Sequence, residues 1–202
     1  MLTRRNFTIA ALAGLGATVL SAGAHARTPP SIDAVFFDPD QPVLGNPDGD
    51  LTIVEYFDYQ CPFCKRNHPD LMRAVEEDGN IRLLMKDWPI FGAASVRATQ
   101  LVLGGLADDS YTQAHDALMA TPGRLSNSDV DTALRGAGLS PDTLRTGYRQ
   151  DRSRLDGLIT RNSRQAAAFG LSGTPAFIIG TVIYPGAMNA NDLANAIQEA
   201  RG

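Results

Sequence analysis

A pair of cysteines three positions apart constrains this sequence more than any other feature, and these are the only two cysteines in its 202 residues. They lie in Cys61-Pro62-Phe63-Cys64, which three residues separate from the end of the β-branched and aromatic run 51–57. That run predicts a buried strand, and Pro62 suits the first turn of a helix, where its missing N–H costs nothing. Residues 81–86 predict a further strand after the helix. The order strand, Cys-x-x-Cys, helix, strand begins a parallel α/β layer.

The spacing of the cysteines favours redox chemistry. On the first turn of a helix, side chains at i and i+3 point the same way, at a separation that suits a disulfide. Cys61 would lie at the helix N-terminus, where unpaired N–H groups and the helix dipole stabilise a thiolate and lower its pKa. Cys64 would lie one turn further in and stay a thiol. We therefore expect Cys61 to form a mixed disulfide with a substrate and Cys64 to resolve it.

Two other uses of the cysteines remain as alternatives. One is a static structural disulfide, although so short a loop constrains the unfolded chain little. The other is a copper or zinc site, because Cys61, Cys64 and His68 fall at i, i+3 and i+7 on one helical face. A Cys-x-x-Cys near a strand–helix–strand pattern favours redox chemistry over both, and that chemistry needs no metal or other cofactor.

Residues 1–26 have the pattern of an export signal. The pair Arg4-Arg5 precedes an uncharged stretch rich in Ala, Leu and Gly, which ends in the small-x-small pattern Ala24-His25-Ala26. The arginine pair followed by Phe7 resembles a twin-arginine signal. A general export signal and a retained membrane anchor are the alternatives. Export would place the chain in an oxidising compartment such as the periplasm, where a close cysteine pair can persist as a disulfide.

The rest of the chain predicts an α/β fold interrupted by helices. Segment 27–50 is an extension rich in Pro, Asp and Gly, with one short strand possible at 34–37. Segments 51–91 and 170–202 supply the α/β part, the second through a predicted β-hairpin and a final helix. Segment 92–169 carries helical periodicity alone.

Composition excludes several classes of protein. Hydrophobic residues make up 44% of the chain and charged residues 20%, which is ordinary globular usage and not that of a disordered or collagen-like chain. The formal net charge is −4 and no basic block is present, so we expect no nucleic-acid partner.

The pieces resemble the DsbA-like branch of the thioredoxin superfamily, from about Leu51 to Gly202. The resemblance is carried by Cys61-Pro62-Phe63-Cys64 at a helix start, the helical insertion, and Gly173-Thr174-Pro175 before a hairpin. It implies a thioredoxin fold with an inserted all-helical domain, and protein disulfide oxidoreductase activity. It also implies a cis bond before Pro175, facing the cysteines, although a trans proline that starts a strand is the alternative. Substrate would bind at Pro62, Phe63 and the backbone of Thr174.

Two charged residues receive roles from the same resemblance. The family carries a buried acid on the strand before the cysteines, and Glu55 matches it and would help to move the proton of Cys64. Lys86 looks like the family's lysine partner on the next strand. From the residues alone, Glu55 could instead face water at a sheet edge and Lys86 could reach the surface.

Thr174 leaves the direction of the reaction open. Oxidases of the DsbA type usually carry Val before the cis proline, whereas Thr is more typical of isomerase and reductase relatives. Those relatives usually have a long N-terminal oligomerisation segment, and residues 27–50 are too few for one, so we expect a monomer. We expect an oxidase that introduces disulfides into exported cysteine-containing proteins and is reoxidised by a membrane or periplasmic redox partner. An isomerase or reductase is the alternative.

Overall fold

A computed structural model describes residues 30–202 of the chain, and the expected export signal at 1–26 lies outside these described residues. The elements follow one another as α1 (Ile32–Phe36), β1 (Val43–Gly45), β2 (Leu51–Phe57), α2 (Pro62–Asp78), β3 (Ile81–Asp87), α3 (Ala93–Gly104), the 3₁₀ turn η1 (Gly105–Ala107), α4 (Tyr111–Met119), α5 (Asn127–Gly136), α6 (Pro141–Gln150), α7 (Arg152–Ala168), β4 (Ala176–Ile179), β5 (Val182–Pro185) and α8 (Ala190–Arg201).

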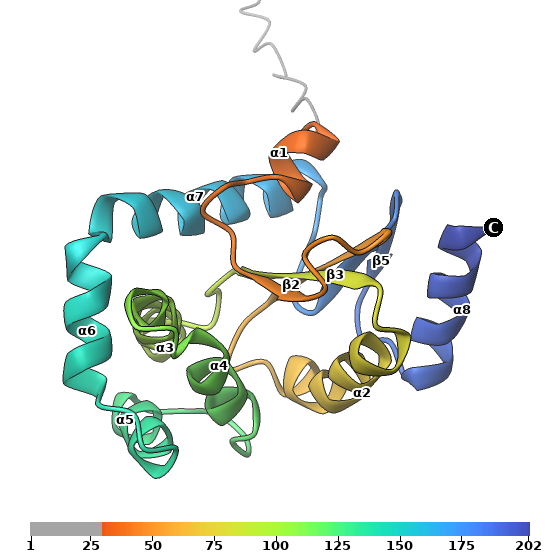
Figure 1. The fold of residues 1–202 in the computed structure, drawn as a ribbon. Coiled ribbons are helices and arrows are strands. Elements are labelled where there is room, and N and C mark those ends of the chain that lie inside the picture. Colours follow the sequence, from red (N-terminus) through yellow and green to blue (C-terminus); the bar gives the residue numbers. More distant parts are fainter. Residues whose placement is uncertain (1–29) are drawn as a thin grey trace, which may run out of the picture.

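A five-stranded sheet in the order β1-β3-β2-β4-β5 lies at the centre of the fold (Figure 1). Strands β2 and β3 are parallel, and the other three pairings are antiparallel. Strand β2 is interior and all of its side chains except Thr52 are buried, as its nearly continuous apolar sequence predicts. The expected strand, Cys-x-x-Cys, helix, strand unit is therefore confirmed.

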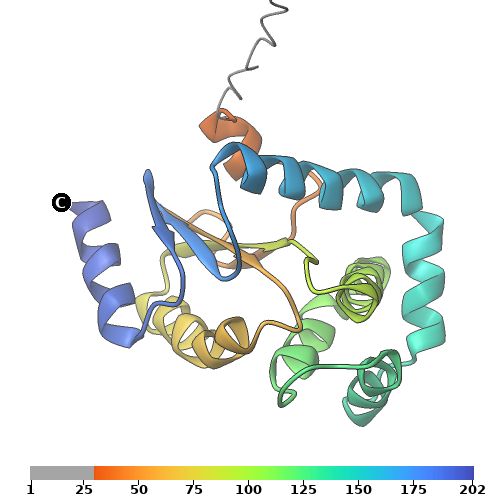
Figure 2. The same cartoon turned by 180° about the vertical axis from the view of Figure 1, so that it is seen from behind.

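Helices cover both faces of this sheet. Helices α2 and α8 pack together on one face, and α1 and α7 lie on the other (Figures 1 and 2). The larger hydrophobic core joins the α2 face of the sheet to α3, α4, α5 and α6. A smaller cluster fills the α1 and α7 face, with Val35, Tyr56 and Ala166 among its buried members. The cysteine-bearing helix thus lies between the sheet and the helical block.

The regular elements of residues 93–168, between β3 and β4, are all helices apart from one 3₁₀ turn, as the helical periodicity predicts. Ser126 and Ser140 cap α5 and α6 through side-chain oxygens that accept backbone N–H bonds. Helix α7 packs on the sheet as well, since Tyr56 Oη donates to Gln165 Oε1 over 3.0 Å. The division into a thioredoxin-like part and a separate helical domain stays a prediction.

The N-terminal extension differs from its prediction. Residues 34–37 are not a strand, because Ile32–Phe36 form the short helix α1, and the Ser31 side chain caps it by accepting from the N–H of Ala34. The strand of this segment is β1, which pairs antiparallel with β3 at the sheet edge. Four apolar residues are too few for their periodicity to distinguish a strand from a helical turn. Within residues 30–202 no helix has the length and apolar character that a bilayer span requires.

Candidate active site

Cys61 is the N-cap residue of α2, so its sulfur lies at the start of that helix. The Sγ atom accepts from the N–H of Cys64 at 3.4 Å, and the thiol donates to the carbonyl oxygen of Thr174 at 3.1 Å. Hydrogen bonding by the Cys64 side chain lowers the pKa of Cys61 to about 6, against the opposing effect of burial. The Thr174 side chain and the N–H groups of Cys64 and Phe63 lower this pKa further. Cys61 can therefore be a thiolate at neutral pH.

The pKa of Cys64 is shifted in the opposite direction from that of Cys61. Its side chain is fully buried, and burial raises the pKa of the Cys64 thiol well above its ordinary value. The hydrogen bond to Cys61 and the negative charges of Glu55 and Cys61 raise this pKa further. Both cysteines are free thiols in the structure. The arrangement thus pairs one ionisable sulfur with one that keeps its proton.

Thr174 and Pro175 face the cysteine pair across the end of the sheet. Their peptide bond is cis, as the resemblance implies, so the trans alternative is wrong. Strand β4 begins directly after them and pairs with β2, which ends just before the cysteine loop. This pairing brings the Thr174 backbone, 113 residues away in sequence, to the Cys61 sulfur.

Glu55 lies on β2 with no exposed surface, so the alternative that it faces water is wrong. Burial raises its pKa well above the ordinary value, and negative charge on Cys61 raises it further. The Cys64 thiol is the one group that lowers the Glu55 pKa. Among the described residues, neither carboxylate oxygen has a hydrogen-bond partner of regular geometry. Glu55 is therefore a carboxyl group close to Cys64 that retains its proton more readily than an exposed acid.

Lys86 is not the partner of Glu55. In the parallel pairing of β2 with β3, Glu55 is opposite Met85, and Tyr56 is opposite Lys86. Since side chains alternate along a strand, Glu55 and Lys86 point to opposite faces of the sheet. The alternative that Lys86 reaches the surface is also wrong, because its side chain has no exposed surface.

The surroundings of Lys86 are polar. Its Nζ donates to Gln41 Oε1 at 3.5 Å and to Asn162 Oδ1 at 3.4 Å. Burial lowers the pKa of Lys86 to about 8, against the opposing charge of Asp38. Lys86 therefore belongs to the face covered by α7, away from the cysteines.

His68 does not join the cysteines in a ligand set. Its side chain is buried, with 8% of its surface exposed, and its Nε2 lies 3.3 Å from Asp116 Oδ1. Among residues 30–202, the group of side chains close enough to share a metal ion combines His68 with His115 and Asp116. The set of Cys61, Cys64 and His68, which the alternative of a copper or zinc site requires, is not brought together.

Residues 38–199 match the family model described as Thioredoxin, which covers most of the chain. The chain belongs to the thioredoxin family. A thioredoxin-like oxidoreductase from Silicibacter pomeroyi DSS-3 is 34% identical, with a TM-score of 0.80 over 85% of this chain and 98% of that one. The catalytic domain of Proteus mirabilis ScsC is 29% identical, with a TM-score of 0.74 over 83% and 93%. The thiol-disulfide exchange protein alpha-DsbA2 from Wolbachia pipientis is 27% identical, with a TM-score of 0.75 over 83% and 90%.

These likenesses confirm the expected thioredoxin fold and the expected enzyme class, a disulfide oxidoreductase. Among curated proteins, Disulfide bond formation protein D of Bacillus subtilis is 23% identical over 79% of this chain and 76% of that protein. The Na(+)/H(+) antiporter NhaA 1 of Salinispora arenicola is 26% identical over 81% of this chain and 25% of the antiporter. The chain thus spans about a quarter of the length of the antiporters that it matches.

Exposed apolar side chains lie next to Cys61 in the sequence and on the segment that follows β3. Pro62 is exposed, and Phe63 directly after it has 49% of its surface exposed beneath the guanidinium of Arg66. Ile90 and Phe91, which follow β3, are each 38% exposed. The role of Pro62, Phe63 and Thr174 in holding substrate stays a prediction.

Asp58 is a site residue that the sequence analysis missed. Its Oδ1 accepts from the N–H of Gln60 and from Ser95 Oγ, both at 2.7 Å. Its Oδ2 accepts from the N–H groups of Ile90 and Phe91 at 2.7 and 3.1 Å. The side chain therefore fixes the loop before Cys61 to the segment after β3. An Asp directly after a strand is the sequence signal for such a turn.

Proposed function

We propose that this chain oxidises cysteine pairs in exported proteins, with Cys61 and Cys64 as its catalytic disulfide. One observation carries the proposal: the pKa of Cys61 is lowered to about 6, while that of Cys64 three residues on is raised. Stabilising the Cys61 thiolate favours the reduced enzyme, so its disulfide becomes the stronger oxidant.

The reaction proceeds in two exchanges. A substrate thiolate attacks Cys61 Sγ of the 61–64 disulfide, which forms a substrate–Cys61 disulfide and releases the Cys64 sulfur with the electron pair of the broken bond. Cys64 then takes up a proton, as its raised pKa favours. A second substrate thiolate attacks the substrate sulfur of the mixed disulfide and releases Cys61 as a thiolate. Two electrons pass from the substrate to the enzyme, and the substrate keeps the new disulfide.

The neighbouring side chains support these steps. Protonated Glu55, whose pKa responds to the Cys64 thiol, delivers the proton to the Cys64 sulfur. Pro175 lies at the cysteines, and the Thr174 backbone offers hydrogen bonds to an extended substrate. Pro62 and Phe63 supply apolar surface beside Cys61. Lys86 has no part in the exchange, since it occupies the other face of the sheet.

The same proposal places the chain outside the cytosol as a monomer, with residues 1–26 as its export signal. A periplasmic thioredoxin-like protein from Salmonella enterica serovar Typhimurium is 29% identical, with a TM-score of 0.74 over 83% of this chain and 94% of that one. Each turnover leaves Cys61 and Cys64 reduced, so a membrane or periplasmic redox partner reoxidises them.

A second candidate is an isomerase or reductase, and Thr174 before the cis proline is the observation that favours it. Equilibration with glutathione buffers measures the reduction potential and separates the two. An oxidase has a potential clearly less negative than the value of about −270 mV typical of thioredoxin. A potential at or below that value would overturn oxidation in favour of the second candidate.

Trapping of clients tests the order of events at the two sulfurs. The Cys64→Ser variant cannot form the 61–64 disulfide, but its Cys61 thiolate can attack a client disulfide and release one client sulfur. Cys64 would otherwise attack Cys61 and free the client, so without it these mixed disulfides should accumulate in cells. The matched control is the double variant Cys61→Ser/Cys64→Ser, which should trap none. Equal amounts of trapped protein in both variants would contradict the role of Cys61.

A further inference from the structure

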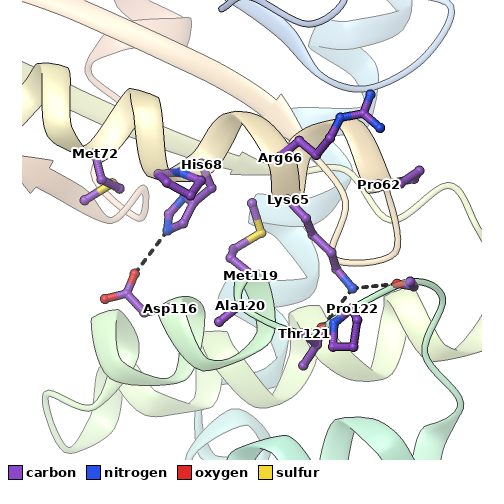
Figure 3. A pocket seen from close by; sticks show the side chains of 12 residues that line it. Pro62, Lys65, Arg66, His68, Met72, Asp116, Met119, Ala120, Thr121 and Pro122 are labelled. Atoms are coloured by element: carbon purple, nitrogen blue, oxygen red, sulfur yellow. Dashed lines mark hydrogen bonds and ion pairs between the residues drawn. The ribbon is translucent and has the colours of Figure 1, made fainter. Parts of the chain in front are cut away.

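A second polar cluster joins the cysteine-bearing helix to the helical block. His68 comes from α2, and His115 and Asp116 come from α4. One ligand atom of each residue lies within 4.8 Å of the others. Figure 3 shows His68 and Asp116 facing each other, at 3.3 Å between Nε2 and Oδ1. None of these atoms takes part in the proposed thiol exchange.

The two imidazole rings are buried without full hydrogen bonding. His115 has no exposed surface, and its Nδ1 lies 2.9 Å from Tyr59 Oη, while its Nε2 has no partner among the described residues. The Nδ1 of His68 is likewise buried and unpartnered within that part of the chain. Buried polar atoms are nearly always paired, so an orphaned ring nitrogen beside a second imidazole and a carboxylate points to a ligand.

We propose that His68, His115 and Asp116 bind a divalent transition-metal ion of the zinc type. Two imidazole nitrogens and one carboxylate oxygen are a known donor set for Zn²⁺, which leaves a fourth position for water or another ligand. In a tetrahedral site with bonds of about 2.1 Å, neighbouring ligand atoms lie roughly 3.4 Å apart. The His68 Nε2–Asp116 Oδ1 distance of 3.3 Å is close to this value.

Small side-chain rotations complete the geometry. The Asp116 side chain is 54% exposed and free to turn, whereas His115 is held by the core. A metal-bound histidine normally donates its other N–H to a hydrogen-bond acceptor, and Tyr59 Oη occupies that place for His115.

A pocket of about 610 Å³ gives access to the cluster. His68 and Asp116 line it together with Met72 and Met119, as Figure 3 shows. The ammonium of Lys65 also borders this pocket, but it donates to Thr121 Oγ1 and the Gly123 carbonyl, each at 2.8 Å. That cation points away from the His68–Asp116 pair (Figure 3). A bound ion would tie α2 to α4 and stabilise the folded chain.

Zinc titration of a cysteine-free chain tests the proposal, because thiolates bind zinc themselves. The Cys61→Ser/Cys64→Ser variant, folded by circular dichroism, is titrated with Zn²⁺ by calorimetry. We expect one ion per chain with a micromolar or tighter dissociation constant, and a rise in melting temperature with added Zn²⁺. Co²⁺ in place of Zn²⁺ should give the intense visible absorption of a tetrahedral site. Absence of saturable binding would overturn the proposal without touching the redox function.

Three substitutions in the same background locate the ion. Asp116→Asn and His68→Gln should each weaken Zn²⁺ binding by about tenfold or more, and Tyr59→Phe, which removes the hydrogen bond to His115, by about tenfold. The matched control is Glu76→Gln, which also removes one negative charge but lies exposed on α2, two turns beyond His68. Binding that is equally tight in Asp116→Asn and Glu76→Gln would place the ion elsewhere and overturn the assignment.

Discussion

The two faces of the central sheet bury Glu55 and Lys86 in contrasting surroundings. On the α2 face, Glu55 has no hydrogen-bond partner of regular geometry among the described residues, and it responds to the cysteines. On the α7 face, Lys86 donates to Gln41 and Asn162. Glu55 is paired with Met85 on the adjacent parallel strand, and Lys86 is the next residue after Met85.

This contrast assigns a structural role to Lys86 and a role in proton transfer to Glu55. Gln41 also donates to the Met85 carbonyl and Asn162 to that of Asp87, so the network around Lys86 holds the N-terminal extension and α7 against β3. A buried charge with such partners stabilises an arrangement, whereas a buried acid without them has a shifted pKa that suits proton transfer. We therefore expect substitutions on the α2 face to change thiol exchange, and those on the α7 face to change stability.

The largest expected effect is loss of exchange in Cys61→Ser. The nucleophilic sulfur is gone, yet serine can still cap α2, so stability should change by less than about 1 kcal/mol. Oxidation of a dithiol peptide, followed by fluorescence or mass spectrometry, measures the activity. The control from the other face is Lys86→Met, which should keep the activity within about twofold. Equal losses of activity in Cys61→Ser and Lys86→Met would contradict the assignment of thiol exchange to the α2 face alone.

Glu55→Gln should slow the release of Cys64 by about 10²-fold, because the proton donor is removed while its shape is kept. Rapid-mixing kinetics of mixed-disulfide formation measures this step, and an unchanged rate would exclude Glu55 from proton transfer.

Stability against pH gives an independent test of Glu55. Since the folded chain holds this proton at higher pH than the unfolded chain does, the wild type should lose stability as pH rises above 4.5, the ordinary Glu value, up to the raised folded pKa. Urea unfolding across that range should show a smaller decline in Glu55→Gln. A decline of the same size in both chains would mean that Glu55 titrates normally.

Asn162→Ala should act on the other face alone. It removes a buried acceptor from Lys86 and should destabilise the chain by about 1–3 kcal/mol. Chemical denaturation measures the loss, and dithiol oxidation should match the wild type at temperatures where the variant is folded. A loss of activity without a loss of stability would contradict the assignment of this face.

The smallest effect is expected from Thr174→Val. The Thr174 side chain lowers the Cys61 pKa, although its Oγ1 has no hydrogen-bond partner of regular geometry among the described residues, so removing this hydroxyl should raise that pKa by about one unit. The rate of alkylation of Cys61 against pH measures the shift. An unchanged pKa would leave the Cys64 side chain and the backbone N–H groups as the sources of thiolate stabilisation.

Local sequence signals predicted much of the fold and the reactive pair. Pro62 in the first turn predicted the start of α2, and the cis bond at Pro175 followed from the resemblance. These features depend on neighbouring residues or on motifs that recur unchanged. The short apolar run at 34–37 failed as a predictor, because four residues fit either a strand or the helical turn that Ser31 caps.

Contacts between residues far apart in the chain could not be predicted from the sequence. Which faces Glu55 and Lys86 occupy depends on the register of β2 against β3, and a shift of one position moves every side chain to the opposite face. The approach of His115 to His68 depends on how α4 packs against α2, which no local pattern encodes.

The central claim is that Cys61 ionises far more readily than Cys64. In the reduced wild-type chain, the rate of Cys61 alkylation as a function of pH, with the modified residue identified by peptide mass spectrometry, measures this directly. The account predicts a midpoint at about 6 for Cys61 and no ionisation of Cys64 over the same range. A Cys61 midpoint near 9.0, the value of an ordinary cysteine, would contradict it.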